Sequence, residues 1–234
     1  HELRTPLTTV RMAADLLYGR RQEFDALAAR STELLSSEVD HFETLLTDLL
    51  EISRFDAGAA ELNLDEIDLG QIAAEELRAQ GRLADTYGTP LVLDAPEPCV
   101  AEVDARRIRR ILRNLITNAI EHGEGRTIVV HVRGDDAAVA VAVRDHGVGF
   151  SAAQAHQVFN RFWRADPARR RTVGGTGLGL SIAMEDARLH GGWLNAWGRP
   201  GQGAQFRLTV PRRAGESVLS SPWPVVPDDA GVPA

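Results

Sequence analysis

The sequence contains no lysine, and all 26 of its basic residues are arginines. Two common phosphate-binding arrangements depend on a lysine, namely the P-loop of nucleotide hydrolases and the phosphate clamp of protein kinases. Both are therefore excluded. A phosphate group in this protein would have to be bound by arginines, backbone N–H groups, a helix N-terminus or a metal ion.

Cysteines and long apolar runs are also scarce. Cys99 is the only cysteine, so no disulfide can form within the chain, which is typical of a reducing compartment. No apolar run approaches the roughly 20 residues of a membrane span, and no signal peptide is recognisable. The formal net charge of −7 argues against general binding to nucleic acid, so we expect no nucleic-acid partner.

Apolar residues at helical spacing predict a helical hairpin in the first quarter of the chain. One stripe runs over residues 3–18, a turn is expected at 19–23, and a second stripe runs over 35–52. Gly58 is a typical helix stop. Because two helices alone bury too little apolar surface to be stable, we expect the hairpin to pair with a second copy as a four-helix bundle.

A mixed helix and strand pattern follows a predicted linker at 59–66. Helices are predicted over 70–87, 104–121 and 177–189, and strands over 91–93, 127–133, 139–144, 193–197 and 204–210. Asp104 can cap the second of these helices. The fold class is therefore α+β, with a second domain at 67–211. Residues 212–234 are rich in Pro and Ser, and we expect them to be disordered.

The first residues combine a nucleophile, a carboxylate and a hydroxyl in His1, Glu2 and Thr5. A neutral imidazole can attack phosphorus, and the ordinary histidine pKa of about 6.5 leaves most of the ring neutral. Glu2 is the type of residue that accepts the released proton, and Thr5 lies one helical turn further on. An exposed histidine at a chain terminus explains this stretch alone at least as well.

Two polar motifs point to a nucleotide. Asn114 and Asn118 share one face of a predicted helix, and their carboxamide oxygens suit Mg²⁺. Asp145 follows a strand, where a carboxylate can accept a hydrogen bond from the exocyclic amino group of adenine, and Gly147 and Gly149 allow close approach to the backbone. A solvated helix face and an ordinary tight turn remain the alternative interpretations.

Glycines at 174–179 precede and open a predicted helix, whose first N–H groups would form an anion site. The run superficially matches a dinucleotide-binding fingerprint, but it follows a β-hairpin rather than an opening strand and helix unit. The arginine-rich segment 161–171 precedes it. We interpret this segment as a lid whose arginines meet phosphates, and a solvated basic loop is the alternative.

The order of these motifs is more specific than any one of them. A phosphoacceptor box, an asparagine box, Asp-x-Gly-x-Gly, Phe-x-x-Phe and Gly-x-Gly-x-Gly follow one another as in sensor histidine kinases, which residues 1–211 resemble. Residues 1–17, 42–58 and 159–180 look especially like sensor kinases of actinobacteria. The resemblance implies a dimerisation and phosphotransfer hairpin at 1–58 and an ATP-binding α/β sandwich of the Bergerat type at 67–211.

The resemblance also implies a role for each matching residue, with ATP and Mg²⁺ as cofactors. His1 would be phosphorylated, Glu2 would act as its base, and Thr5 would serve a phosphatase activity. Asn118 would bind Mg²⁺ with support from Asn114, and Asp145 would recognise adenine. The other nucleotide-binding positions would be Gly147, Gly149, Arg161, Gly175, Thr176, Gly177, Leu178 and Gly179.

One position departs from the family. Where many relatives carry a lysine just after the asparagine box, this chain has Glu121, followed by His122. A carboxylate near phosphates is unfavourable, so we expect Glu121 to point elsewhere and His122 to pack against the nucleotide.

The implied partners are a response regulator and a second copy of the chain. The chain starts at His1 without a methionine, so we expect it to be the cytoplasmic portion of a longer cell-membrane protein, with membrane contact only through the missing N-terminal region. Two alternatives stay open, a Bergerat-fold ATPase acting as a clamp and a non-catalytic nucleotide-binding dimerisation module. Such ATPases place a glutamate base where Asn114 stands, and asparagine cannot take a proton from water.

Overall fold

The computed structural model describes residues 4–163 and 176–230. The chain forms two compact units that separate after Gly58. The first is the predicted helical hairpin, made of α1 (Arg4–Gly19), the short 3-10 helix η1 (Arg21–Glu23) and α2 (Ala26–Asp56). Asp25 caps α2 by accepting a hydrogen bond from the Ala28 N–H at 2.8 Å.

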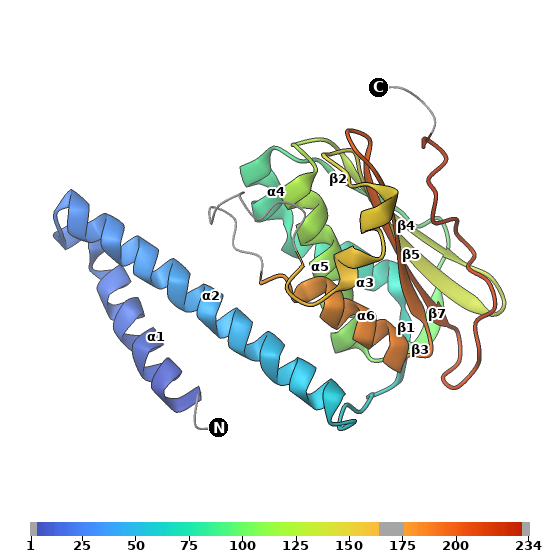
Figure 1. Ribbon diagram of the computed structural model, residues 1–234, viewed down its shortest axis with the longest axis horizontal. Coiled ribbons are helices and arrows are strands. Elements are labelled where there is room, and N and C mark those ends of the chain that lie inside the picture. Colours follow the sequence, from blue (N-terminus) through green and yellow to red (C-terminus); the bar gives the residue numbers. More distant parts are fainter. Residues whose placement is uncertain (1–3, 164–175, 231–234) are drawn as a thin grey trace. The chain divides into compact units, whose positions relative to one another are not determined.

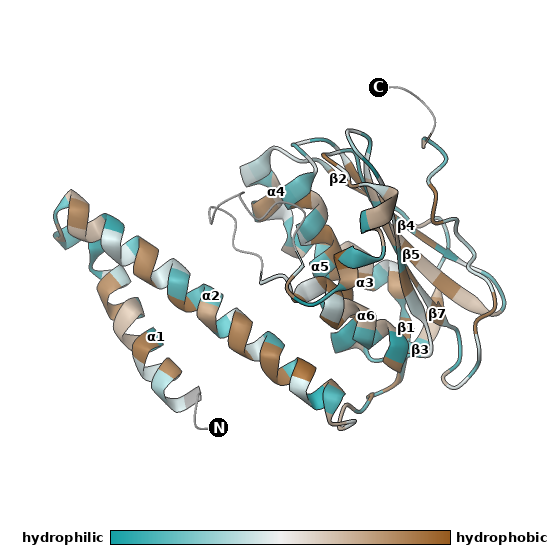
Figure 2. Cartoon of the chain, viewed as in Figure 1, coloured by the Kyte–Doolittle hydropathy of each residue, from teal (hydrophilic) through white to brown (hydrophobic). Residues whose placement is uncertain are grey.

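The hairpin on its own leaves much of its apolar surface uncovered. Large apolar side chains are exposed on both helices, and Figure 2 shows apolar residues along the whole length of α2. They are Val10, Met12, Leu16, Leu17, Tyr18, Leu27, Leu34, Leu35, Phe42 and Leu49. Few side chains in this unit are fully buried. An apolar surface of this extent is what the predicted four-helix bundle requires.

The second unit contains a five-stranded sheet and a separate two-stranded ribbon (Figure 1). The sheet order is β2 (Leu91–Asp94), β4 (Ile128–Gly134), β5 (Ala138–Asp145), β7 (Gly203–Pro211) and β6 (Trp193–Arg199). β2 and β4 are parallel and the other neighbours are antiparallel. β1 (Asp65–Asp68) pairs antiparallel with β3 (Val100–Val103). The expected α+β class, with a helical hairpin followed by an α/β sandwich, is confirmed.

Helices α3 (Leu69–Ala79), α5 (Ala105–His122) and α6 (Gly179–Leu189) cover one face of the sheet (Figure 1). The short helix α4 (Gly81–Tyr87) and the 3-10 helices η2 (Ala152–Gln154) and η3 (Gln157–Phe159) complete the unit. Strand alternation sends every second residue of β5 into this core. The central core side chains are Ile111, Leu112, Leu115, Ile116, Val139, Val141 and Val143, all with 0% exposure.

A buried carboxylate fixes α6 against α5. Asp186 of α6 is fully buried and accepts hydrogen bonds from Arg107 at 2.8 Å and from Arg110 at 2.7 Å on both oxygens. A buried carboxylate is tolerated when cations and hydrogen bonds satisfy both of its oxygens. This pairing positions the N-terminal end of α6, which bears the predicted anion site.

The structure differs from the sequence expectations at several boundaries. Residues 59–66, expected to be a linker, include the start of β1. Asp104 caps α5 with its Oδ1, and the Asn63 N–H donates a hydrogen bond to its Oδ2. The helix expected at 70–87 is divided between Ala79 and Gly81. The ribbon of β1 and β3 was not predicted, because two four-residue strands carry little periodic signal.

The end of the chain also differs from expectation. We expected residues 212–234 to be disordered, yet 212–230 have a described course, and Gln205 on the outer face of the sheet donates hydrogen bonds to the carbonyls of Pro224 and Val225. Composition alone did not reveal these contacts, because they depend on the face of the sheet to which Gln205 points. Within the described ranges, no helix has the length and apolar character needed to cross a membrane.

Candidate nucleotide-binding site

The Asp145 carboxylate lies at the end of β5 with only 4% of the residue exposed. Its Oδ1 accepts hydrogen bonds from the N–H groups of Gly147 at 3.0 Å and Ala204 at 3.3 Å. Burial raises the pKa of Asp145, while these two N–H groups act in the opposite direction. Among the described residues Oδ2 has no hydrogen-bond donor, so this oxygen can accept one from a ligand.

Glycines bring the turn after β5 against neighbouring backbone. A Cβ on Gly147 would lie 1.8 Å from the His122 carbonyl oxygen, and one on Gly149 would lie 2.0 Å from the Arg199 carbonyl oxygen. Gly149 also has a positive φ of 61°. The structure shows that these glycines let the turn pack against the end of α5 and the β6–β7 connection. Close approach of a ligand to them stays a prediction.

A third glycine, which packs against this turn from the start of β7, was missed in the sequence. A Cβ on Gly203 would lie 2.0 Å from the Asp145 carbonyl oxygen, and its φ is 81°. The residue starts β7 and brings the Ala204 N–H to the Asp145 carboxylate. The Gly-Gln-Gly run at 201–203 was the available signal, although such a run indicates only a turn.

The two asparagines of α5 have different environments. Asn114 Nδ2 donates a hydrogen bond to the carbonyl of Gly179, the first residue of α6, at 2.9 Å. A Cβ on Gly179 would meet Asn114 Oδ1 at 3.1 Å, so the two residues pack closely. Asn118 is half-buried, and its carboxamide makes no hydrogen bond within the part of the chain that the structure describes. Asn114 thus connects two helices, and Asn118 can accept a ligand.

The start of α6 differs from the starts of α3 and α5. Asp68 and Asp104 cap the first N–H groups of α3 and α5, whereas no side chain among the described residues caps α6. Gly177 precedes it with a φ of 70°. Uncapped N–H groups and the positive helix end favour a phosphate there. Gly175 and the rest of 164–175, which include most of the expected lid, lie outside the described residues.

The Phe-x-x-Phe segment packs against this glycine turn. The Phe162 N–H donates to the Gly177 carbonyl at 2.9 Å, and a Cβ on Gly177 would lie 3.0 Å from the Phe162 Cα. Phe162 itself has a positive φ of 61°. The segment and the turn before α6 therefore hold each other in place, with the half-buried Thr176 and the buried Leu178 on either side of the glycine.

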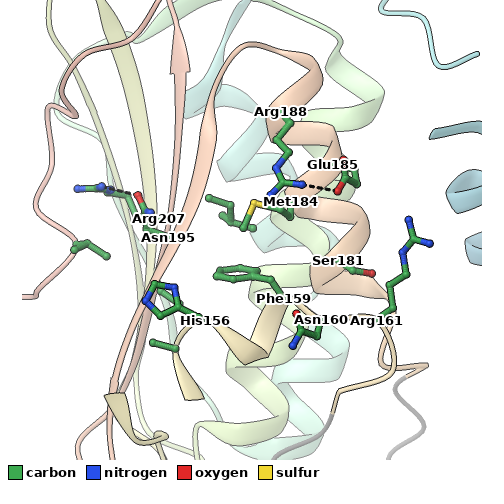
Figure 3. A pocket seen from close by; sticks show the side chains of 14 residues that line it. His156, Phe159, Asn160, Arg161, Ser181, Met184, Glu185, Arg188, Asn195 and Arg207 are labelled. Carbon is green, nitrogen blue, oxygen red and sulfur yellow. Dashed lines mark hydrogen bonds and ion pairs between the residues drawn. The ribbon is translucent and has the colours of Figure 1, made fainter. Parts of the chain in front are cut away.

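A pocket of about 640 Å³ lies between η3, α6 and β6 (Figure 3). Arg161 lines it together with Arg188, which pairs with Glu185 at 2.8 Å. Neither Asp145 nor Asn118 is part of this lining. The pocket is therefore distinct from the surroundings of the Asp145 carboxylate, and Arg161, within the Phe-x-x-Phe segment, belongs to its lining.

Glu121 and His122, which follow the asparagine box, have different surroundings. The charge of Glu121 acts on Tyr87 of α4, and burial together with this charge raises the pKa of the Tyr87 hydroxyl. Glu121 thus lies near Tyr87 of α4, and its avoidance of phosphates stays a prediction. His122 is exposed at the end of α5, and its carbonyl accepts from the Val148 N–H at 3.1 Å.

The phosphoacceptor residues belong to the other unit. Thr5 is exposed on α1, whereas His1 and Glu2 lie outside the described residues. Among the described residues no group of three or more His, Cys, Asp and Glu side chains could hold a metal ion.

The Gly147 turn gives a direct test of this site. Gly147→Ala should lower nucleotide affinity at least about tenfold, because the added methyl group must displace the turn that carries Asp145 from the His122 carbonyl. Gly81→Ala is a matched control, since a Cβ at that position would have nothing within 4 Å. Calorimetric titration with ATP measures both. Wild-type affinity in Gly147→Ala would contradict the tight packing at this turn.

Comparison with known families agrees with the two units. The family model "His Kinase A (phospho-acceptor) domain" matches residues 1–58, and "Histidine kinase-, DNA gyrase B-, and HSP90-like ATPase" matches residues 103–214. A solved structure, "ShkA full-length in complex with AMPPNP", aligns with a TM-score of 0.79 and 27% identity, covering 93% of this chain and 45% of that one.

The chain is also similar to curated mycobacterial proteins. "Sensor histidine kinase MtrB" of Mycobacterium leprae is 56% identical over 228 residues, covering 97% of this chain and 41% of that protein. The protein of the same name from Mycobacterium tuberculosis is also 56% identical, with 97% and 40% covered. The chain thus spans about two fifths of these relatives. Because the phosphoacceptor and ATPase-type domains occur together and in this order, the chain belongs to the sensor histidine kinases.

Proposed function

We propose that this chain binds ATP with Mg²⁺, transfers the terminal phosphoryl group to His1 and passes it on to an aspartate of a response regulator. The proposal rests on the buried Asp145 carboxylate. Among the described residues one of its oxygens has no donor, and it lies in an ATPase-type domain joined to a phosphoacceptor domain. That oxygen would accept a hydrogen bond from the 6-amino group of adenine.

The phosphates of ATP would bind without a lysine. The uncapped N-terminus of α6 offers backbone N–H groups, and Gly177 and Gly179 keep side chains out of the way. Arg161 would reach the terminal phosphate, and His122 would pack against the nucleotide. The proposed contacts also include Gly147, Gly149, Gly175, Thr176 and Leu178.

Asn118 is suited to bind a metal ion. Its carboxamide is half-buried and unpaired among the described residues, and the absence of a carboxylate cluster there fits a metal held largely by phosphate oxygens. Mg²⁺, when bound, neutralises charge on the phosphates. Asn114 would support this arrangement by holding α5 against the start of α6.

The helical unit would supply the acceptor chemistry. His1 would attack the terminal phosphorus, Glu2 would accept the proton that the ring loses, and the hydroxyl of Thr5 would orient a water for removal of the regulator's phosphate. The apolar side chains exposed along α1 and α2 support a homodimer formed through a four-helix bundle. The response regulator would dock on this hairpin.

The clamp-type ATPase is a less favoured alternative. It would need a general base where Asn114 stands, and the Asn114 carboxamide instead donates to the Gly179 carbonyl. An amide cannot accept the proton of an attacking water. Slow hydrolysis would leave ATP available for transfer to His1, which favours the kinase over the clamp.

Transfer to His1 can be tested with γ-labelled ATP. Wild-type protein should retain label in an acid-labile, base-stable bond, as expected for phosphohistidine, and His1→Gln should lose all of it while binding ATP normally. His41→Gln is a matched control, because His41 lies on α2 of the same unit. Label that persists in His1→Gln would place the acceptor elsewhere, and an absence of label in wild type would favour a non-catalytic module.

The metal role of Asn118 can be tested separately. Asn118→Ala should weaken binding of ATP with Mg²⁺ by about tenfold or more, but should change binding of metal-free ADP by less than about twofold, because only the metal ligand is lost. Thr117→Ala, the neighbouring half-buried position on α5, serves as the control. Equal losses for both nucleotides in Asn118→Ala would indicate general damage to the helix.

A further inference from the structure

The C-terminal segment covers the face of the sheet opposite α5 and α6. In β7, Phe206 and Leu208 point into the helical core, and Gln205 and Thr209 point the other way. Polar residues on an open face would be solvated, but Gln205 is 1% exposed and Thr209 is fully buried. The cover is the segment after β7, drawn in red in Figure 1.

Trp223 anchors the segment at one side of the sheet. Its ring stacks on His131 of β4 with centroids 4.6 Å apart, and the Arg133 guanidinium lies 4.9 Å from the Trp223 ring centroid. The Trp223 carbonyl accepts a hydrogen bond from Arg207. The indole N–H is buried without an acceptor among the described residues, so stacking and the cation–π contact have to outweigh that cost.

Side chains of β7 hold the middle of the segment. Gln205 Nε2 donates to the carbonyls of Pro224 at 3.1 Å and Val225 at 3.0 Å, and the Thr209 and Ser221 hydroxyls lie 2.9 Å apart. Buried side chains that bond backbone carbonyls fix the path of a chain that has no regular secondary structure. The segment therefore follows one defined course towards the end of β5.

At that end, Asp229 binds both residues beside Asp145. Its two oxygens accept from Arg144 Nε at 3.2 Å and Nη2 at 3.1 Å, and its Oδ2 lies 2.8 Å from His146 Nε2. Although partial burial by itself would raise the pKa of Asp229, the hydrogen bonds from Arg144 and His146 lower it. Asp229 is thus an ionised, bidentate partner of Arg144.

Arg144 transmits this contact to the Asp145 turn. Its side chain is only 5% exposed, and its Nη1 donates to the Asp145 carbonyl at 2.6 Å. The Arg144 charge also acts on the Asp145 carboxylate. A buried guanidinium needs an anionic partner. Without Asp229, the partners of Arg144 among the described residues would all be neutral, namely the carbonyls of Asp145 and Ala204 and the Trp197 ring. A movement of the guanidinium towards another anion or water would then displace the Asp145 turn that it bonds.

We propose that residues 221–229 form a strap that positions the adenine-binding turn, and that Asp229 is a positioning residue for nucleotide binding. The proposal rests on the proposed role of Asp145 in binding adenine. The strap neutralises the Arg144 cation on the outer face of the sheet. The Asp145 carboxylate on the inner face then stays available to a ligand. It also fixes His146, whose Nδ1 lies 3.2 Å from the Thr127 carbonyl.

Asp228 and Asp229 provide a matched pair for the test. Asp229→Asn removes the charge that neutralises Arg144 and should raise the dissociation constant for ATP about fivefold, a size suited to an ion pair whose carboxylate is 43% exposed. Asp228→Asn changes an exposed neighbour and should leave the constant unchanged. Calorimetric titration of the full chain gives the dissociation constant and the number of sites separately.

These two quantities distinguish positioning from damage to the fold. A destabilised protein loses sites without a change in the dissociation constant, whereas a displaced turn raises the constant at an unchanged number of sites. Asp229→Glu should restore most of the affinity, because it keeps the charge. The strap proposal would be overturned if Asp229→Asn had the wild-type dissociation constant for ATP. It would also be overturned if Asp228→Asn lost as much affinity as Asp229→Asn.

Asp145→Asn separates this proposal from the one on which it rests. If Asp145→Asn weakens ATP binding and Asp229→Asn does not, the strap proposal fails and the adenine site stands. If Asp145→Asn binds ATP as wild type does, the adenine site is wrong and the strap proposal is overturned with it.

Discussion

The Asp145 carboxylate is buried at the end of the central strand β5. The residues around it satisfy one of its oxygens and neutralise the neighbouring Arg144. Two backbone N–H groups hold one of its oxygens, and they reach it only because Gly147 and Gly203 lack side chains. On the other face of the sheet, Arg144 is neutralised by Asp229. A desolvated acceptor of this kind is costly to build, and its other oxygen is the group that we propose recognises adenine.

Because the sequence contains no lysine, we expect backbone N–H groups and arginines to bind the phosphates. Asp186 draws Arg107 and Arg110 together and so sets α6 on α5, which places the uncapped first turn of α6 beside Asn114. Backbone N–H groups in a fixed turn bind phosphate without the flexibility of a lysine side chain. The same packing that forms the core of the second unit therefore also positions the helix start at which we propose that phosphate binds.

Local patterns explain which parts could be predicted from the sequence. The helical hairpin, the Asp104 cap of α5 and the β4–β5 hairpin depend on residues close together in the chain. The order of the motifs led to the family. The C-terminal segment could not be predicted, because Trp223 and Asp229 depend on His131 and Arg144, which lie more than 80 residues earlier. Gly203 was missed for the same reason, since its need for a small side chain comes from a distant carbonyl.

We propose that the Asp145 oxygen without a donor among the described residues accepts a hydrogen bond from the 6-amino group of adenine. Inosine triphosphate has the same ribose and phosphates but carries a carbonyl in place of that amino group. Calorimetric titration of the full chain should show ATP binding about ten- to a hundredfold more tightly than inosine triphosphate, as expected for loss of a hydrogen bond to a charged group. Equal affinities for the two nucleotides would show that Asp145 does not recognise the 6-amino group of adenine.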